Sequence, residues 1–478
     1  MKRVLVKQIA LKSISVLLIF LPLYLLLGAM IPQAFKPAQV AVPEVTARLG
    51  RVWDEGGGGS VPDAVRAIGD SRDALNLRIA LMREARERLD ISYYSVSNLS
   101  AGDAFLSEMI QAADRGVEVR LMIDGKMGKL LTKTKRALAA HPHITVANYN
   151  PVNILKPWDF NEVMHDKFMI VDGRYAILGG RNIEPAYFDV AEDCVMPKLD
   201  WDILMVKTDP DAAPERSIVD TIAGYNELLW QSPKAKTVKA NARSLENLRE
   251  IHEDAAVFRA DHPEYYTHDL AYYTADLIRP ERIKLIHNPL NSGRKEPWVF
   301  QSVAELASEA EESIFIQTPY ATASPFILDF MSRSAATAPT AVMTNSFASA
   351  LNLPAFSNYA YQKGQFVDTG VKLHEFQGDR SLHGKAYQFD GKITLIGSYN
   401  LDSRSTHMTT ETMVVVDSEP FAEHFKEQRD RILDESLVVG KDVEYLPSET
   451  VTEKSVAPTK MTLYMLGYIL LRPFQYFL

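Results

Sequence analysis

One polar pattern occurs twice in this chain, with the same spacing in both copies. In each copy a histidine is followed by a lysine two positions on, an aspartate seven, a glycine fourteen and an asparagine seventeen positions on. The residues are His165, Lys167, Asp172, Gly179 and Asn182 in the first copy, and His383, Lys385, Asp390, Gly397 and Asn400 in the second. Such a match is too specific to be coincidence. Two core histidines without function are the alternative, but the polar residues around each one favour a single active site built from two halves of the chain.

A short hairpin is predicted inside each copy. Strand-like runs at 168–171 and 387–389 lead into Asp-Gly turn dipeptides, and return strands follow at 175–178 and 393–396. Side chains alternate along a strand, so each histidine shares a face with its lysine, and the asparagine returns to the same end of the sheet. The turn aspartates lie away from that end. We therefore expect Asp172 and Asp390, although they belong to the six candidate catalytic residues of the motifs, to be structural or to hold partners by hydrogen bonds.

The elements around the two motifs are predicted to repeat as well. The first half has helical patterns near 74–89 and 102–115 and strand patterns at 91–96, 117–123 and 144–149. The second half has helical patterns at 300–312 and 324–335 and strand patterns at 314–317, 340–343 and 371–376. This order predicts an α/β fold of two pseudo-symmetric halves, each a mixed β-sheet flanked by helices. Residues 345–369 show little periodicity and are predicted to form a loop over the pocket, where they could set the choice of acceptor.

The two copies resemble the His-x-Lys-x4-Asp motif, and the Gly-Ser-x-Asn element after it, of the phospholipase D superfamily. Residues 112–117, 317–320 and 400–405 resemble the branch that contains bacterial cardiolipin synthases. The resemblance covers roughly residues 75–435 and departs at Gly180, where serine is commoner. It implies two phospholipase D-like halves that together form a phosphatidyltransferase.

The residue types suit chemistry on a phosphodiester. Lysine and asparagine groups from two halves can stabilise its oxygens, and Asn182, Asn400 and Ser398 are expected to bind phosphate. One imidazole can attack phosphorus to form a phosphohistidine, while the other protonates the leaving alkoxide and then deprotonates an alcohol or water. The resemblance implies His165 as nucleophile and His383 as acid and base, an order that the residues alone leave open. No cofactor or metal is expected, and the single Cys194 is interpreted as a small buried residue.

Carboxylates near each motif are expected to orient the imidazoles. Glu411 precedes the strand-like run 412–416, and Asp202 precedes the run 203–206. A carboxylate on the far ring nitrogen of a histidine fixes its tautomer. The alternative for both is a solvated acid at a strand edge, and the extra residues 184–200 leave the alignment of Asp202 open.

Both ends of the chain are apolar. Four cations precede an uncharged run at 13–35 that is long enough to cross a bilayer as a helix. Residues 1–36 are therefore predicted to be a cytoplasmic start and a transmembrane signal anchor in the cell membrane, with the catalytic domain outside. A cleaved signal peptide is the alternative. The aromatic tail at 461–478 is expected to associate with the membrane or, alternatively, to pack on the domain.

Six segments are predicted along the chain. They are the anchor (1–36), a linker with a Gly-rich run (37–75), the first half (76–207), a helical connector (208–282), the second half (283–435), and a linker with the membrane-associated tail (436–478). The Gly-rich run is flexible by composition.

Charge and the apolar ends narrow the function. The net charge of −9 argues against a nuclease, because a surface that follows nucleic-acid phosphates is usually basic. We predict a membrane-anchored phosphatidyltransferase that resembles cardiolipin synthase, with phospholipid (phosphatidylglycerol above all) and the membrane as partners and no nucleic acid. The alternatives are a phospholipase D that makes phosphatidic acid, then a phosphodiesterase or nuclease, and last an inactive scaffold, against which both complete motifs argue. The oligomeric state stays open.

Overall fold

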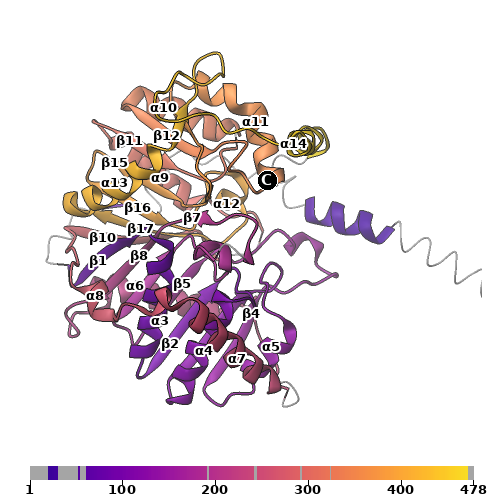
Figure 1. The fold of residues 1–478 in the computed structure, drawn as a ribbon, viewed down its shortest axis with the longest axis vertical. Coiled ribbons are helices and arrows are strands. Elements are labelled where there is room, and N and C mark those ends of the chain that lie inside the picture. Colours follow the sequence, from indigo (N-terminus) through magenta and orange to yellow (C-terminus); the bar gives the residue numbers. More distant parts are fainter. Residues whose placement is uncertain are drawn as a thin grey trace, which may run out of the picture.

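Two eight-stranded sheets form the frame of the molecule (Figure 1). The computed structural model describes residues 20–30, 52–53, 61–190, 193–241, 245–290, 293–322 and 324–471. In spatial order the first sheet contains β1 (Asp63–Ile68), β8 (Asp202–Lys207), β6 (Tyr175–Gly179), β5 (Lys167–Val171), β2 (Arg88–Tyr93), β3 (Glu118–Asp124), β4 (Ile144–Tyr149) and β9 (Ala235–Thr237). The second sheet contains β10 (Arg282–His287), β17 (Thr412–Asp417), β16 (Ile393–Gly397), β15 (Ala386–Phe389), β11 (Ile314–Gln317), β12 (Thr340–Asn345), β13 (Lys372–Phe376) and β18 (Ser436–Val438).

The two sheets have the same topology. At each step from one edge to the other, the pair of neighbouring strands is parallel or antiparallel in both sheets alike. In both, the parallel pairs join the second, third and fourth strands from the β9 or β18 end, which are β4, β3 and β2 in the first sheet and β13, β12 and β11 in the second. The predicted α/β fold of two pseudo-symmetric halves with mixed sheets is confirmed.

Helices cover the sheets, which are buried on both faces. The first half carries α3 (Ser71–Glu84), α4 (Ala101–Asp114), α5 (Thr132–Leu138), α6 (Ile218–Gln231), α7 (Glu246–Asp261) and α8 (Leu270–Thr274). The second carries α9 (Trp298–Glu309), α10 (Pro325–Thr337), α11 (Leu353–Asp368), α12 (Ser403–His407), α13 (Glu419–Leu433) and α14 (Pro458–Leu471). Along β8, Leu204 and Val206 join one apolar core, while Ile203 and Met205 join another. This alternation explains why the strand is apolar throughout.

The predicted hairpins form at both motifs. Asp172 and Gly173 have φ of 51° and 62°, and Asp390 and Gly391 have φ of 52° and 61°, as the two central residues of a type I′ turn require. Asp172 accepts hydrogen bonds of 2.8–2.9 Å from the backbone N–H groups of residues 86–88. Asp390 accepts bonds of 2.8–3.0 Å from residues 311–313. Both aspartates therefore hold the start of a neighbouring strand.

An apolar core joins the halves. Trp201 from the first half packs on Phe425 of α13 with 4.7 Å between ring centroids, and Ile396 and Val414 of the second sheet belong to the same cluster. Two short strands also pair in parallel across the junction, β7 (Lys198–Leu199) with β14 (Ser381–Leu382). The junction is thus a packed interface that can fix side chains from both halves in one place.

Several predicted boundaries are wrong. The linker prediction for 37–75 fails from Asp63 on, because β1 pairs with β8 and α3 begins at Ser71. The connector prediction for 208–282 fails because α6 packs on the first sheet and β9 forms its edge. β18 extends the second half past residue 435. Residues 353–368 of the predicted loop form α11. Short strands, and helices whose polar and apolar residues are mixed, show little periodicity in the sequence. Whether they form depends on tertiary contacts.

The chain ends are described only in part. Residues 20–30 are helical, whereas the rest of the predicted anchor and the Gly-rich run lie outside the described residues. Within the described ranges, no helix combines the length and the apolar character that a bilayer crossing needs. The tail helix α14 packs on the second half, with Tyr464 buried and its hydroxyl donating to the carbonyl of Ala350 at 3.0 Å.

Candidate active site

Both motif histidines line one cavity at the junction of the halves. The cavity has a volume of about 400 Å³, and Asn182 and Asn400 also line it. His165 comes directly before β5, and His383 lies just before β15, the equivalent strand of the second sheet. The repeated strand order therefore brings the two imidazoles to one place from opposite halves.

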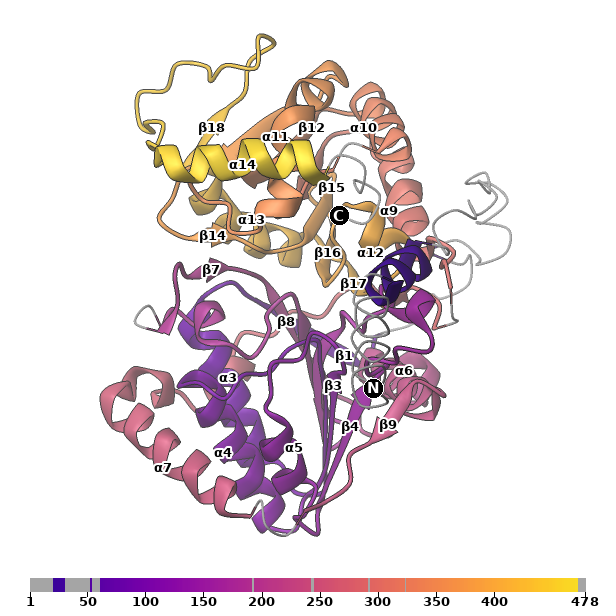
Figure 2. The same cartoon turned by 90° about the vertical axis from the view of Figure 1, so that its right-hand side faces the viewer.

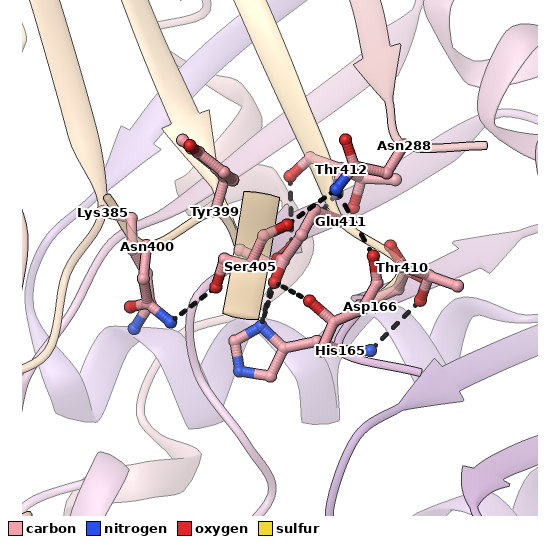
Figure 3. Close-up of polar contacts among 12 residues, drawn as sticks. His165, Asp166, Asn288, Lys385, Tyr399, Asn400, Ser405, Thr410, Glu411 and Thr412 are labelled. Atoms are coloured by element: carbon pink, nitrogen blue, oxygen red, sulfur yellow. Dashed lines mark hydrogen bonds and ion pairs between the residues drawn. The ribbon is translucent and has the colours of Figure 1, made fainter. Parts of the chain in front are cut away.

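The first imidazole is held by the second half (Figure 3). His165 Nδ1 lies 3.0 Å from both carboxylate oxygens of Glu411. Glu411 is fully buried and accepts further hydrogen bonds from Ser398 at 2.5 Å and Thr409 at 2.7 Å. The backbone N–H of His165 donates to the hydroxyl of Thr410 at 3.1 Å. The structure thus places Glu411 beside an imidazole, and that imidazole belongs to the other motif.

The second imidazole is held by the first half. His383 Nδ1 lies 2.6 Å from Asp200 Oδ2, and Asp200 is buried. The backbone N–H of His383 donates to the carbonyl of Leu199 at 2.7 Å, next to the β7–β14 pair. Each histidine thus takes its carboxylate partner from the opposite half, so neither half forms a complete site alone.

This geometry sets the protonation of both rings. A carboxylate at Nδ1 favours the tautomer with the proton on Nδ1, which leaves the lone pair on Nε2. Burial and then the nearby lysine ammonium groups lower the pKa of both His165 and His383 well below the ordinary value. Both imidazoles are therefore neutral near pH 7, as a nucleophile and a general base must be.

A lysine folds back onto each histidine. Lys167 Nζ donates to the carbonyl of His165, and Lys385 Nζ donates to the carbonyl of His383 and lies 2.8 Å from its Nδ1. Burial lowers the pKa of Lys167 to about 8 and that of Lys385 to about 7. An anion in the cavity would favour the charged form of both lysines.

The two motif asparagines make equivalent contacts with different partners. Asn182 Nδ2 donates to the hydroxyl of Tyr187 at 3.0 Å, and Asn400 Nδ2 donates to the hydroxyl of Ser405 at 3.2 Å. Tyr187 and Ser405 each stand five positions after their asparagine. The side-chain oxygens of both asparagines are buried without a hydrogen-bond partner among the described residues. A phosphate group would not pair with these oxygens, but a hydroxyl donor from a substrate could.

Two predicted site residues lie elsewhere. Asp202 does not contact an imidazole: its Oδ2 accepts from Arg78 at 2.9 Å and from Arg181 at 3.1 Å, both buried. Strand register explains the correction, because Gly179 pairs with Asp202 while the equivalent Gly397 pairs with Met413. The true counterpart of Glu411 is therefore Asp200. Ser398, predicted to bind phosphate, does not line the cavity and instead donates to Glu411.

Several cavity residues were missed from the sequence. The cavity residues Tyr187 and Lys198, and Asp200 behind His383, come from a stretch after the first motif that is longer than its counterpart in the second half, so the spacing of the repeat could not align them. Tyr94 and Tyr320 also line the cavity, at the ends of the equivalent strands β2 and β11. The two tyrosines could have been predicted as cavity residues from the sequence only because each follows one of these equivalent strands.

Comparison with known proteins agrees with this geometry. A family model described as "Cardiolipin synthase, PLD-like domain" matches residues 79–215 and 303–433. Cardiolipin synthase C of Escherichia coli (strain K12) is 27% identical over 391 residues, which cover 74% of this chain and 81% of that protein. Cardiolipin synthase A of Klebsiella pneumoniae (strain 342) is 22% identical over 391 residues, which cover 80% and 72%.

A solved structure shares the fold. The crystal structure of phosphatidylserine synthase from Haemophilus influenzae Rd KW20 superposes with a TM-score of 0.60 at 14% identity, and covers 87% of this chain and 95% of that one. At this identity the likeness supports the arrangement of the two halves alone. The family match, in contrast, includes both motifs and more than half of the chain. The chain therefore belongs to the cardiolipin synthase family with the phospholipase D-like domain, and it is a phospholipase D-type enzyme.

Proposed function

We propose that the protein is a phosphatidyltransferase that moves a phosphatidyl group from one phospholipid to an alcohol through a phosphohistidine. The observation that carries this proposal is the pair of imidazoles in one cavity, each held at Nδ1 by a buried carboxylate of the other half. The names of the curated relatives favour a lipid acceptor, with phosphatidylglycerol as the first choice for both donor and acceptor.

His165 is the nucleophile in this proposal. Within the described residues, its Nε2 has no hydrogen-bond partner and His165 lines the cavity, whereas His383 Nε2 lies 3.3 Å from the hydroxyl of Tyr187. In the first step His165 Nε2 attacks phosphorus, a P–N bond forms, and the P–O bond to the leaving headgroup breaks. The bound phosphate anion favours the protonated form of His383, which takes up a proton at Nε2 and gives it to the leaving oxygen.

The second step reverses these roles. The hydroxyl of the acceptor gives its proton to His383, its oxygen attacks phosphorus, and the P–N bond to His165 breaks. Lys167 and Lys385 stabilise the charge on the phosphoryl oxygens in both steps. The buried carboxylates of Glu411 and Asp200 stabilise the imidazole cation or the phosphohistidine at the opposite ring nitrogen.

Product analysis tests the proposal directly. Purified protein is incubated with phosphatidylglycerol, with and without ethanol. Transfer predicts cardiolipin and free glycerol without ethanol, and phosphatidylethanol when ethanol is added. Phosphatidic acid as the sole product under both conditions would show hydrolysis and contradict transfer. The His383→Asn variant is the blank, since it lacks the acid and base.

We propose further that the surface around the cavity docks on a lipid bilayer. The loop between β4 and β5 exposes Val152, Ile154, Leu155, Trp158 and Phe160 by 42–74%. Helix 20–30 lies on this loop, with Tyr24 donating to the carbonyl of Leu155 at 3.3 Å. The loop leads into Val163, which lines the cavity. Aromatic and aliphatic side chains at such density suit the boundary between headgroups and acyl chains.

The second half offers a matching apolar face. α14 exposes Leu463, Met465, Leu466, Ile469 and Leu470 by 50–68%. Its opposite side holds residues 348–350, which lead into the cavity residue Asn352. Figure 2 shows α14 and helix 20–30 on the same side of the molecule. Apolar surface therefore flanks the cavity from both halves, and a bilayer is the occupant that fits a lipid substrate.

Paired substitutions test this surface. Leu155→Asp with Leu466→Asp is expected to lower turnover of phosphatidylglycerol in vesicles at least tenfold relative to turnover of a short-chain, monomeric phosphatidylglycerol. The control is Val257→Asp on α7, where an equally exposed apolar residue lies away from the cavity. An unchanged ratio in the double variant would contradict docking.

A further inference from the structure

The hydroxyl of Tyr187 is the centre of a small polar cluster on the His383 side of the cavity. It accepts a hydrogen bond from Asn182 Nδ2 at 3.0 Å and from Lys198 Nζ at 3.1 Å, and it lies 3.3 Å from His383 Nε2. A phenol oxygen has two acceptor positions and one proton. Because both acceptor positions are used, the phenol proton is directed at His383 Nε2, which also lies 3.3 Å from Lys385 Nζ.

Tyr187 thus occupies the place that a reacting hydroxyl must take. In the second step of the proposed reaction, the acceptor hydroxyl donates its proton to His383 Nε2, as Tyr187 does here. Among the described residues, no hydroxyl of the second half takes this place at His165 Nε2. Ser405, at the position equivalent to Tyr187, is not hydrogen-bonded to it. This difference marks the His383 side of the cavity as the acceptor side.

Lys198 adds a positive charge near His383 Nε2, from which the Tyr187 hydroxyl separates it. Its ammonium lines the cavity, donates to the Tyr187 hydroxyl and lies 4.3 Å from the centre of the Tyr187 ring. Within the described residues it has no ion-pair partner, whereas the neighbouring Lys129 is paired with Glu184 at 2.6 Å. The Lys198 side chain is partly buried near the carboxylates of Glu184 and Asp200, and an anion at its ammonium would stabilise the charged form further.

We propose that Lys198 and Tyr187 form a subsite for an anionic acceptor, in which the ammonium of Lys198 binds the phosphate that the acceptor already carries. The acceptor's free hydroxyl then replaces that of Tyr187 at His383 Nε2. The motif lysines Lys167 and Lys385 hold the phosphate that reacts, so a third cation is available for a phosphate that does not. An alcohol of the phosphatidylglycerol type, with a phosphate three carbons from its terminal hydroxyl, has the chemistry that this subsite would select. The inference rests on the proposed phosphatidyl transfer and names its acceptor class.

A competition between acceptors tests the subsite. Full-length enzyme is incubated with phosphatidylglycerol and ethanol together, and cardiolipin, phosphatidylethanol and phosphatidic acid are measured in the same sample. Loss of one charge-assisted hydrogen bond predicts that Lys198→Gln lowers the ratio of cardiolipin to phosphatidylethanol at least tenfold, while Lys198→Arg keeps most of it. The ratio comes from one sample, so it does not depend on how much of the variant is folded.

The controls separate this inference from the proposed function. Lys133→Gln removes an exposed lysine that pairs with Glu250 away from the cavity, and it should leave the ratio unchanged. An unchanged ratio in Lys198→Gln, or an equal loss of all three products, would overturn the anion subsite while transfer itself stands. A wild-type enzyme that makes phosphatidic acid only would refute transfer, and the subsite with it.

Discussion

The two half-sites do the same work with different side chains. On the His165 side the carboxylate is Glu411, steered by the hydroxyl of Ser398 at 2.5 Å. On the His383 side the shorter Asp200 faces Gly180, where an added Cβ would lie 2.1 Å from its Oδ1. A serine therefore fits beside the glutamate but not beside the aspartate. The departure of Gly180 from the family pattern is thus explained by its partner Asp200.

The half-sites differ more in the hydroxyl residues, Tyr187 and Ser405, that accept hydrogen bonds from the motif asparagines. Ser405 is small and leaves His165 Nε2 open to the cavity, whereas Tyr187 reaches His383 Nε2 and brings Lys198 with it. The nearly symmetric frame thus carries an asymmetric pair of imidazoles. This asymmetry separates a nucleophile from an acid and base, which identical half-sites could not do.

The largest effect is expected at the histidines. His165→Asn and His383→Asn should each lower phospholipid turnover at least ~1,000-fold, because each removes a reacting group. An activated donor with a p-nitrophenyl leaving group needs no general acid, so His383→Asn should still release a burst of p-nitrophenol, whereas His165→Asn should release none. Stopped-flow absorbance checks this. A burst from His165→Asn alone would reverse the assignment of the two roles.

The second-largest effect on turnover is expected at the two carboxylates that contact the imidazoles. Glu411→Gln and Asp200→Asn should each lower turnover by about 100-fold to 10,000-fold with little loss of folded protein, because the wrong imidazole tautomer is then favoured. Asp202→Asn is the matched control, since it breaks a buried ion pair with Arg78 and Arg181 and should cost about 3–5 kcal/mol of stability. Turnover per folded molecule and thermal unfolding distinguish the two effects. A larger loss of turnover per folded molecule in Asp202→Asn than in Asp200→Asn would contradict the corrected register.

A smaller effect is expected from pH on phosphate binding. The pKa of Lys385 is lowered to about 7 and that of Lys167 to about 8, so a rise in pH through this range removes positive charge from the cavity. The affinity for a soluble phosphodiester should therefore fall between pH 6.5 and pH 9, by up to about tenfold per pH unit for each proton lost. Calorimetric titration over this range measures it. An affinity that rises with pH would show that the lysines bind in their neutral form.

The smallest effect is expected at the hydroxyls that distinguish the halves. The proton of Tyr187 favours neutral His383, so Tyr187→Phe should raise the pKa of His383 and move the acid limb of the pH–rate profile to higher pH by about one unit or less. Ser405→Ala should leave that limb in place, because Ser405 does not touch His383. Equal shifts in both variants would mean that Tyr187 and Ser405 are equivalent after all.

The repeat in the sequence was enough to predict the duplicated fold and most of the shared site. The motif spacing grouped Lys167 with His165 and Lys385 with His383, as their contacts do, because hairpin geometry fixes where such residues lie. Asp202 was predicted because it directly precedes the apolar run 203–206, and only the pairing register shows that Asp200 is the counterpart of Glu411. That each imidazole takes its carboxylate from the other half depends on how the sheets pack, which no local pattern encodes.

Other features depended on tertiary contacts. β1 follows a Gly-rich run and is held by pairing with β8, so its short sequence was mistaken for linker. Tyr187 and Lys198 lie in a stretch that is longer than its counterpart in the other half, so the comparison of halves could not reveal them. The parts of the site that differ between the halves are thus the parts that a repeat cannot predict.

Trapping the covalent intermediate is the most direct test of a shared site with one nucleophile. The His383→Asn variant, which lacks the base for the second step, is mixed with the activated donor, digested and analysed by mass spectrometry under conditions that preserve phosphohistidine. The account predicts the donor's phosphoryl group on the peptide that contains His165, and no adduct in His165→Asn. An adduct on any other residue of the His383→Asn variant, or the same adduct in His165→Asn, would contradict it.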